Sequence, residues 1–229
     1  MSLFGGEPQA RACSLLDTFT TGGKPVKRWC VRGIVALGVF ATLLVSEGLC
    51  AEGKKKGAKP KREPDVHFVP TPPDVVDIML HLVRVKKDDV VYDLGCGDGR
   101  IVVAAAKRYG CKAAGYDIDP QRVRESLANV KKNKVEGLVT IEEKDIFTLD
   151  LRPASVVTLY LLPELNVKLI PQLEKLKPGS RIVSHDFDMK GVKPDMVLTM
   201  WSKKDRDEHT IYVWSTPLRK EDKEEEAQE

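Results

Sequence analysis

The chain has 229 residues, of which 42% are hydrophobic and 31% are charged. These proportions exclude a collagen-like, low-complexity or wholly disordered protein. A polytopic membrane protein is also excluded, because it needs several long apolar runs and the sequence has only one. The five cysteines follow no spacing typical of zinc ligands or of a disulfide framework, so they indicate neither a metal site nor a disulfide scaffold.

The net charge of +3 is unevenly distributed along the chain. Residues 1–70 hold 11 Lys and Arg against 6 Asp and Glu, whereas residues 219–229 hold 3 against 6. Residues 71–218 hold 23 against 22 and are therefore close to neutral. This central region lacks the basic excess typical of nucleic-acid-binding proteins, and we expect no nucleic-acid partner.

An apolar segment, residues 33–51, follows a basic segment, residues 1–32, that we expect to be disordered. A basic flank, a short apolar run and small residues are typical of a signal peptide, yet the same stretch is just long enough to span a bilayer. A buried core helix is the third reading. Leu49 stands where a small residue should precede Cys50, which argues against a lipoprotein site.

Residues 52–64 carry six Lys and Arg and no apolar side chain larger than alanine, so we expect a linker. Basic residues directly after a membrane-spanning segment favour the topology in which they remain in the cytoplasm. They can also bind the anionic lipid headgroups of the membrane surface. We therefore expect membrane contact through residues 33–62. A solvated linker is the alternative.

A folded domain is predicted over residues 65–218, followed by a charged, disordered tail over residues 219–229. The segment Thr71-Pro72-Pro73-Asp74 predicts the start of a helix, with the Thr71 hydroxyl as its cap, a proline at the first helical position and a carboxylate three residues after the cap. Apolar residues then recur at helical spacing as far as Val83.

Strands and helices alternate through the rest of the domain. Strands are predicted at Asp89–Leu94, Lys112–Asp117, Leu138–Ile141, Ser155–Leu162 and Arg181–His185, and a closing hairpin at Met196–Trp201 and Thr210–Trp214. Helices are predicted at Gly99–Tyr109, after the Asp119-Pro120 cap with Val123, Leu127 and Val130 on one face, and at Pro163–Lys177, kinked or divided by Pro171. This alternation predicts an α/β, doubly wound, mostly parallel sheet that binds ligands at the carboxyl ends of its strands.

A glycine-rich turn follows the first predicted strand. Gly95, Gly97 and Gly99 alternate along it and let the backbone turn sharply and approach a ligand. The dinucleotide fingerprint needs a glycine where Arg100 stands, so the turn suits a ligand without a pyrophosphate. Asp93, just before the turn, can face a positive group, and Cys96 is more typical of a small filler than of a nucleophile.

Acidic residues follow the next two strands. Asp117 can accept both hydroxyls of a ribose, whereas Asp119 is better explained as a helix cap. Asp145 could accept an adenine amine, with Ile146 covering the ring.

The order of these features resembles the class I S-adenosylmethionine (SAM)-dependent methyltransferases, and DVVYDLGCGDGRIVVAAA is similar to the first motif of that superfamily. The resemblance covers about residues 65–216. It implies a Rossmann-like methyltransferase fold with a seven-stranded sheet in the order 3-2-1-4-5-7-6 and strand 7 antiparallel. It also implies SAM as cofactor, bound by Asp93, Gly95, Cys96, Gly97, Gly99, Asp117, Asp145 and Ile146.

A narrower resemblance rests on FVPTP, VTLYLLP and RIVSH. These segments resemble the lysine methyltransferases that modify the ATP synthase c-subunit and the adenine nucleotide translocase, which also carry an apolar segment before the catalytic domain. The resemblance implies a protein substrate bearing a lysine, and it places Tyr160 and Pro163 beside the transferring methyl group.

A lysine must lose its proton before it can accept a methyl group, because its free pKa is about 10.4, and an apolar site lowers that pKa. Our hypothesis is that Tyr160, helped by Glu164 or His185, orients the amine. A packed strand residue is the alternative for Tyr160, and a core histidine the alternative for His185.

Three other functions are weighed against this one. A small-molecule methyltransferase would use the same cofactor. A nicotinamide-dependent oxidoreductase is disfavoured by Arg100 and by the lack of a Tyr-x-x-x-Lys pair, and a non-catalytic cofactor-binding module by the presence of all the acidic residues. The Asp/Asn-Pro-Pro-Tyr signature of amide and adenine methylation is absent after the fourth predicted strand.

Because secretion would remove the enzyme from its cofactor supply, we expect a membrane anchor with the catalytic domain in the cytoplasm. Export after signal-peptide cleavage is the alternative.

Overall fold

The computed structural model describes residues 67–221. The predicted segments 1–32, 33–51 and 52–64 lie outside these residues, as does the tail beyond Glu221. Within the described range, no helix is both long enough and apolar enough to cross a membrane. Residues 219–221, which the sequence assigns to the tail, lie against the segment around Val192, which forms a β-bridge with Lys220.

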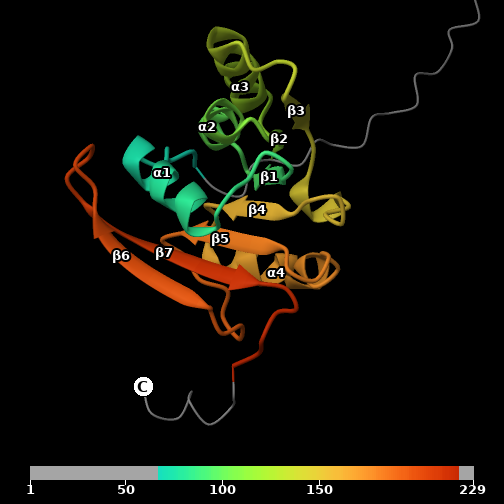
Figure 1. Cartoon of the computed structure of the whole chain (residues 1–229), viewed down its shortest axis with the longest axis vertical. Coiled ribbons are helices and arrows are strands. Elements are labelled where there is room, and N and C mark those ends of the chain that lie inside the picture. Colours follow the sequence, from blue (N-terminus) through green and yellow to red (C-terminus); the bar gives the residue numbers. More distant parts are fainter. Residues whose placement is uncertain (1–66, 222–229) are drawn as a thin grey trace, which may run out of the picture. The chain divides into compact units, whose positions relative to one another are not determined.

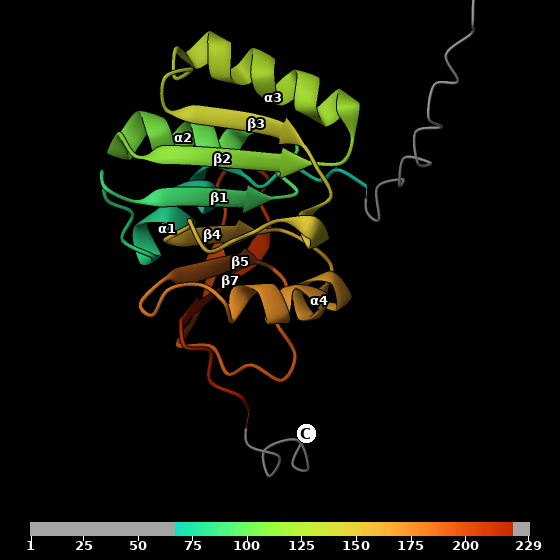
Figure 2. The same cartoon turned by 90° about the vertical axis from the view of Figure 1, so that its right-hand side faces the viewer.

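Seven strands form one sheet in the order β3-β2-β1-β4-β5-β7-β6, which confirms the predicted order (Figure 2). Their bounds are β1 Val90–Leu94, β2 Lys112–Asp117, β3 Val139–Glu143, β4 Val156–Leu159, β5 Arg181–His185, β6 Met196–Trp201 and β7 Glu208–Ser215. Strands β1 to β5 are parallel, and β7 runs antiparallel to both β5 and β6. The last strand of the chain, β7, therefore lies inside the sheet, and β6 forms the edge strand on that side (Figure 1).

Helix α1 precedes the first strand, and three further α-helices and a short 3-10 helix connect the strands. Their bounds are α1 Pro73–Leu82, α2 Arg100–Tyr109, α3 Pro120–Asn133, η1 Ile146–Thr148 and α4 Pro163–Leu173. Buried residues of α1 and α2 form one core cluster against the sheet, and Leu169 and Leu173 of α4 form a second cluster with Trp214. Helices α2 and α4 lie on opposite faces of the sheet (Figure 2), as expected for a doubly wound fold.

The prediction that Thr71 caps the first helix is wrong. Pro72 is the N-cap residue, and no side chain caps the helix. The Thr71 hydroxyl lies 3.2 Å from Nδ1 of His185 instead. The Asp74 carboxylate accepts hydrogen bonds from the Ser202 hydroxyl and the Lys203 amide. Contacts to the far end of the chain have replaced the local capping that the sequence suggests.

The fourth strand and the fourth helix are both shorter than predicted. Strand β4 ends at Leu159, because the chain leaves the sheet to begin α4 at Pro163. Helix α4 ends at Leu173; Pro171 lies inside its last turn and does not divide it. Pro171 lacks the N–H that would donate to the carbonyl oxygen of Val167, so the backbone hydrogen bonds of the helix have one gap there.

The inward face of α3 also differs from the prediction. Leu127 is half exposed, and the buried residues of the helix are Ser126 and Val130. The Ser126 hydroxyl donates to the carbonyl oxygen of Gly97 at 2.8 Å. A polar side chain thus occupies an inward position because it bonds to the glycine turn after β1.

Candidate active site

A cavity opens at the carboxyl ends of β1, β2 and β4. Its walls include residues 67–71, here called the N-terminal strap, together with segments that follow the strands. Among the residues singled out from the sequence, the lining contains Asp93, Gly95, Cys96, Asp117, Asp145, Ile146 and Tyr160. Gly97, Gly99, Glu164 and His185 are not part of the lining.

The glycine turn, residues 95–99, needs glycine for two separate reasons. Gly97 and Gly99 have φ angles of 55° and 74°, in the left-handed region that other residues rarely adopt. A Cβ atom on Gly97 would also lie 2.2 Å from the Phe68 ring, and one on Gly99 would lie 2.8 Å from the Ser126 hydroxyl. These two glycines therefore let the strap and α3 approach the turn.

Asp93, at the end of β1, carries an unpaired carboxylate oxygen. Its Oδ1 accepts a hydrogen bond of 2.6 Å from the Thr158 hydroxyl, whereas Oδ2 is buried and has no partner among residues 67–221. Burial raises the pKa of Asp93 to about 7, although the Thr158 hydrogen bond acts to lower it. A buried, unsatisfied carboxylate at a cavity wall suits a cationic ligand group, which would supply the missing partner.

Asp117, at the end of β2, holds the turn and still has acceptor capacity. Its Oδ2 accepts from the amide of Gly97, and its Oδ1 from the amide of Asp119, both at 2.9 Å. Burial raises its pKa, against the effect of these two bonds. Because each carboxylate oxygen has two lone pairs, the group can accept two further hydrogen bonds, for example from neighbouring hydroxyls. Asp119 caps α3 through the Gln121 amide, as predicted.

The segment after β3 places Asp145 and Ile146 at the cavity. Asp145 precedes the short helix η1 and accepts a hydrogen bond of 3.0 Å from the amide of Phe147. This bond fixes the position of the carboxylate at the strand end. Ile146 supplies the neighbouring apolar surface that the sequence suggests for covering a flat ring.

Two arginines hold the N-terminal strap, and sequence reasoning missed both. Arg100 donates from Nη1 to the carbonyl oxygen of Thr71 at 2.8 Å, and its guanidinium pairs with Asp98 at 2.6 Å. The guanidinium of Arg122 lies over the Phe68 ring, 4.7 Å from its centroid. In the sequence alone, Arg100 was significant only because it stands where the dinucleotide fingerprint needs a glycine. An arginine two residues after an aspartate, in the first turn of a helix, was the available signal.

Replacing Arg100 with Ala is expected to loosen the strap. The hydrogen bond from a charged group to Thr71 contributes about 1.5–3 kcal/mol, so its loss should make amide hydrogen exchange in residues 67–72 about tenfold faster or more. Exchange followed by mass spectrometry measures this directly. Arg124→Ala, on the exposed side of α3, is the matched control and should leave exchange in the strap unchanged. Equal exchange in wild type and Arg100→Ala would contradict the role given to Arg100.

The three residues predicted to orient the acceptor amine lie in different environments. Tyr160 lines the cavity, and burial raises its pKa. His185 is fully buried with its ring centroid 4.0 Å from that of Tyr160, and burial lowers its pKa. Glu164 is exposed in the first turn of α4. The structure thus brings Tyr160 alone of the three to the cavity wall, with His185 packed against its ring.

Comparisons with known proteins show the family to which the chain belongs. The family model described as the ANTKMT methyltransferase domain matches residues 93–196. The protein-lysine N-methyltransferase of Saccharolobus islandicus is 46% identical over 153 residues, which are 66% of this chain and 94% of that protein. The human lysine N-methyltransferase of the ATP synthase c-subunit is 29% identical over 141 residues, 59% of this chain and 60% of that protein.

Among solved structures, an RNA methyltransferase from Salinibacter ruber in complex with S-adenosyl-L-homocysteine is similar at 47% identity and a TM-score of 0.61. The match covers 65% of this chain and 94% of that one.

Proposed function

Because the chain belongs to the ANTKMT family of class I SAM-dependent methyltransferases, we propose that it methylates the side-chain amine of a lysine in a protein substrate. The observation that carries the proposal is the 46% identity to the protein-lysine N-methyltransferase of Saccharolobus islandicus, over 94% of that protein's length. SAM is the cofactor.

The residues at the cavity support a specific assignment of contacts to SAM. We propose that Oδ2 of Asp93, which has no partner among the described residues, receives the cationic methionine end beside Gly95 and Cys96. Asp117 would accept the ribose hydroxyls with its remaining lone pairs. Asp145 and Ile146 would hold the adenine at the end of β3. Gly97 and Gly99 would act indirectly, by allowing the turn to take its shape.

Catalysis of methyl transfer depends mainly on positioning the acceptor amine relative to the methyl group. SAM supplies a methyl group already activated by a positive sulfur, so the chain has to align acceptor and donor and exclude water. The amine nitrogen forms the new bond to the methyl carbon as the carbon–sulfur bond breaks, and the electron pair remains on sulfur. Phe68, Val69 and Leu161 supply apolar surface at the cavity, which favours the neutral amine that this attack requires.

Tyr160 is the residue that we propose to orient the amine. It lines the cavity, and its raised pKa keeps the phenol protonated, so its oxygen can accept a hydrogen bond from the amine. His185 would act as a positioning residue through its contact with the Tyr160 ring. We propose no direct contact for Glu164, whose side chain lies off the cavity lining.

A labelled-methyl transfer assay tests the acceptor class. The full chain is incubated with SAM labelled in its methyl group and a cell extract divided into protein, RNA and small-molecule fractions. Label is expected in protein, and as methyllysine after hydrolysis. RNase-sensitive label would favour the RNA activity named for the Salinibacter ruber relative, which the near-neutral central region does not suggest. Label confined to small molecules would favour the small-molecule alternative.

We also propose that residues 33–51 anchor the chain in a membrane with the catalytic domain in the cytoplasm. Support comes from the sequence alone: an apolar stretch followed by six cations within residues 52–64. The full chain should remain with membranes after alkaline carbonate extraction, whereas a chain lacking residues 1–51 should be released. A mature N-terminus near Ala51 would show cleavage and favour export.

A further inference from the structure

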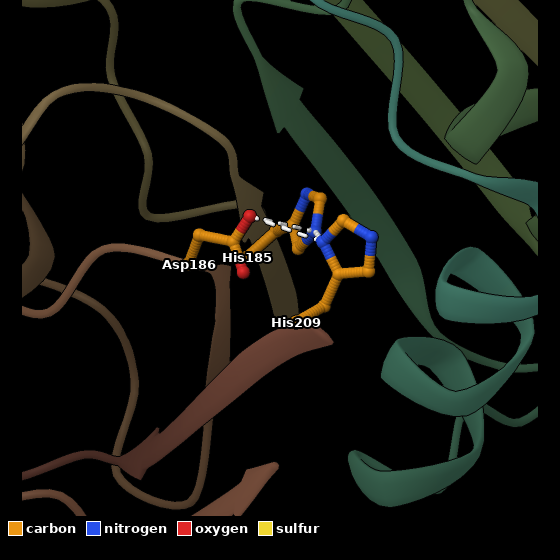
Figure 3. Close-up of side chains that lie close together, drawn as sticks. All are labelled: His185, Asp186 and His209. Atoms are coloured by element: carbon orange, nitrogen blue, oxygen red, sulfur yellow. Dashed lines mark hydrogen bonds and ion pairs between the residues drawn. The ribbon is translucent and has the colours of Figure 1, made fainter. Parts of the chain in front are cut away.

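Two histidines and an aspartate converge beside the active-site cavity (Figure 3). His185 ends β5, Asp186 follows it, and His209 is the second residue of β7, which pairs with β5. The distance from His185 Nε2 to His209 Nδ1 is 2.9 Å, and Asp186 Oδ2 lies 3.2 Å from each nitrogen. Three potential ligand atoms from three side chains thus form a closed triangle.

While Asp186 is ionised, no placement of protons on the two ring nitrogens gives a hydrogen bond between each of the three pairs of atoms. Each ring nitrogen offers either one N–H or one lone pair in the plane of its ring. If His185 donates to His209, the lone pair of His209 faces the lone pairs of Asp186. If His209 donates instead, the lone pair of His185 faces the aspartate. Either arrangement leaves two acceptors in contact, and protons on both nitrogens would leave two N–H groups in contact. A cation placed between the atoms would satisfy all three.

The spacing suits a metal ion. In a tetrahedral zinc site, with ligands about 2.0–2.2 Å from the metal, neighbouring ligand atoms are about 3.3–3.6 Å apart. The triangle here has sides of 2.9, 3.2 and 3.2 Å. Two imidazoles and one carboxylate favour a divalent first-row transition metal over magnesium or calcium, which prefer oxygen ligands.

The outward-facing atoms of all three side chains are held as they are in known metal sites. Nε2 of His209 lies 3.0 Å from the Asp205 carboxylate, and Nδ1 of His185 lies 3.2 Å from the Thr71 hydroxyl. The remaining oxygen of Asp186 accepts from the amide of Thr210 at 2.9 Å. Partners of this kind fix the tautomer and orientation of metal-binding histidines.

The backbone and the burial of the cluster agree with a built site. Asp186 has a φ of 59°, in the left-handed region, and this conformation directs its carboxylate back toward the two histidines. His185 is fully buried and His209 is 7% exposed, while Asp186 is only partly buried. Aspartate tolerates this backbone region better than most residues.

We propose that His185, Asp186 and His209 bind one divalent transition metal ion of the zinc class. The ion would join the end of β5 to the start of β7 and, through Thr71, to the N-terminal strap. It would thereby fix the wall against which the Tyr160 ring packs. The site does not depend on which acceptor the enzyme methylates.

Cobalt titration of the full chain tests the proposal. The chain is stripped with a chelator, its thiols are alkylated so that the cysteines cannot bind metal, and Co²⁺ is added while visible absorption is recorded. One Co²⁺ per chain is expected to bind with the intense bands of a tetrahedral site, and Zn²⁺ should displace it. Asp186→Asn and His209→Gln should each weaken binding about tenfold or more.

Matched controls separate this site from surface binding. His81→Gln and Asp188→Asn replace exposed residues of the same types and should bind Co²⁺ as the wild type does. Because His209 is buried, Asp205→Asn serves as a further variant; its side chain is 43% exposed, and its loss should weaken binding about tenfold without disturbing the core. Absence of saturable binding by the wild type, or equal affinity in wild type and all three site variants, overturns the proposal.

Discussion

Replacing Asp93 with Asn is expected to weaken SAM binding about a hundredfold or more and, at the same time, to stabilise the ligand-free chain at pH 8. The loss of binding follows because a buried charge-assisted contact to the cationic end of SAM would disappear, at a cost of about 3 kcal/mol. The gain in stability follows because the ligand-free chain buries a carboxylate oxygen that has no partner within residues 67–221.

The pH dependence of that stability has a definite sign. The pKa of Asp93 rises from 3.8 to about 7 on folding, so the folded chain holds a proton that the unfolded chain releases. The penalty is absent below about pH 4, grows as the pH rises and is complete above about pH 7, where it amounts to roughly 2–4 kcal/mol. Asp93→Asn removes the penalty, so the two chains should differ in stability at pH 8 and converge near pH 4.

Two measurements check this prediction. Urea unfolding at several pH values gives the free energy of unfolding, and calorimetry gives the dissociation constant of SAM. In the wild type, SAM affinity should fall as the pH drops below about 7, by at most about tenfold per pH unit, because one proton must leave Asp93. Asp88→Asn, in an exposed loop before β1, is the control and should change neither quantity. Wild-type SAM affinity in Asp93→Asn would remove Asp93 from the binding site.

Replacing Asp117 with Ala is expected to abolish measurable SAM binding. The variant would lose two hydrogen bonds to the ribose, together with the bonds that hold the Gly97 and Asp119 amides. Hydrogen bonds to a charged group contribute about 1.5–3 kcal/mol each, so the ribose contacts alone account for a loss of about a hundredfold to ten-thousandfold.

A ligand lacking the ribose hydroxyls separates the two effects of Asp117. Calorimetry would compare S-adenosylhomocysteine with its 2′,3′-dideoxy analogue in wild type and in Asp117→Ala. If Asp117 binds the hydroxyls, the substitution should weaken binding of the natural ligand far more than binding of the analogue. Equal losses for both ligands would instead mean that Asp117 acts only by shaping the glycine turn.

Much of the fold follows from patterns that are local in the sequence. The order of strands and helices follows from hydrophobic periodicity, and the turn at Gly95–Gly99 follows from the need for left-handed backbone. The placement of Asp93 and Asp117 at one cavity also follows, because parallel strands bring their carboxyl ends to the same edge.

The remaining features depend on contacts between residues far apart in the chain. Thr71 has the sequence context of a helix cap, yet its hydroxyl lies against His185, 114 residues away. Arg100 holds a strap whose path no local pattern reveals. His209 meets His185 because β7 enters the sheet beside β5, and the spacing of two histidines in a sequence carries no sign of that pairing.

The position of β7 inside the sheet has a consequence for folding during synthesis. Strand β5 is complete once His185 has been made, but its partner β7 ends only at Ser215. At a synthesis rate of about 5–20 residues per second, β5 waits about 2–6 seconds with one edge unpaired. An exposed strand edge can pair with other chains, so this interval carries a risk of aggregation for the nascent enzyme. The half of the sheet formed by β1, β2 and β3 can assemble earlier, whereas the wall behind Tyr160 is completed last.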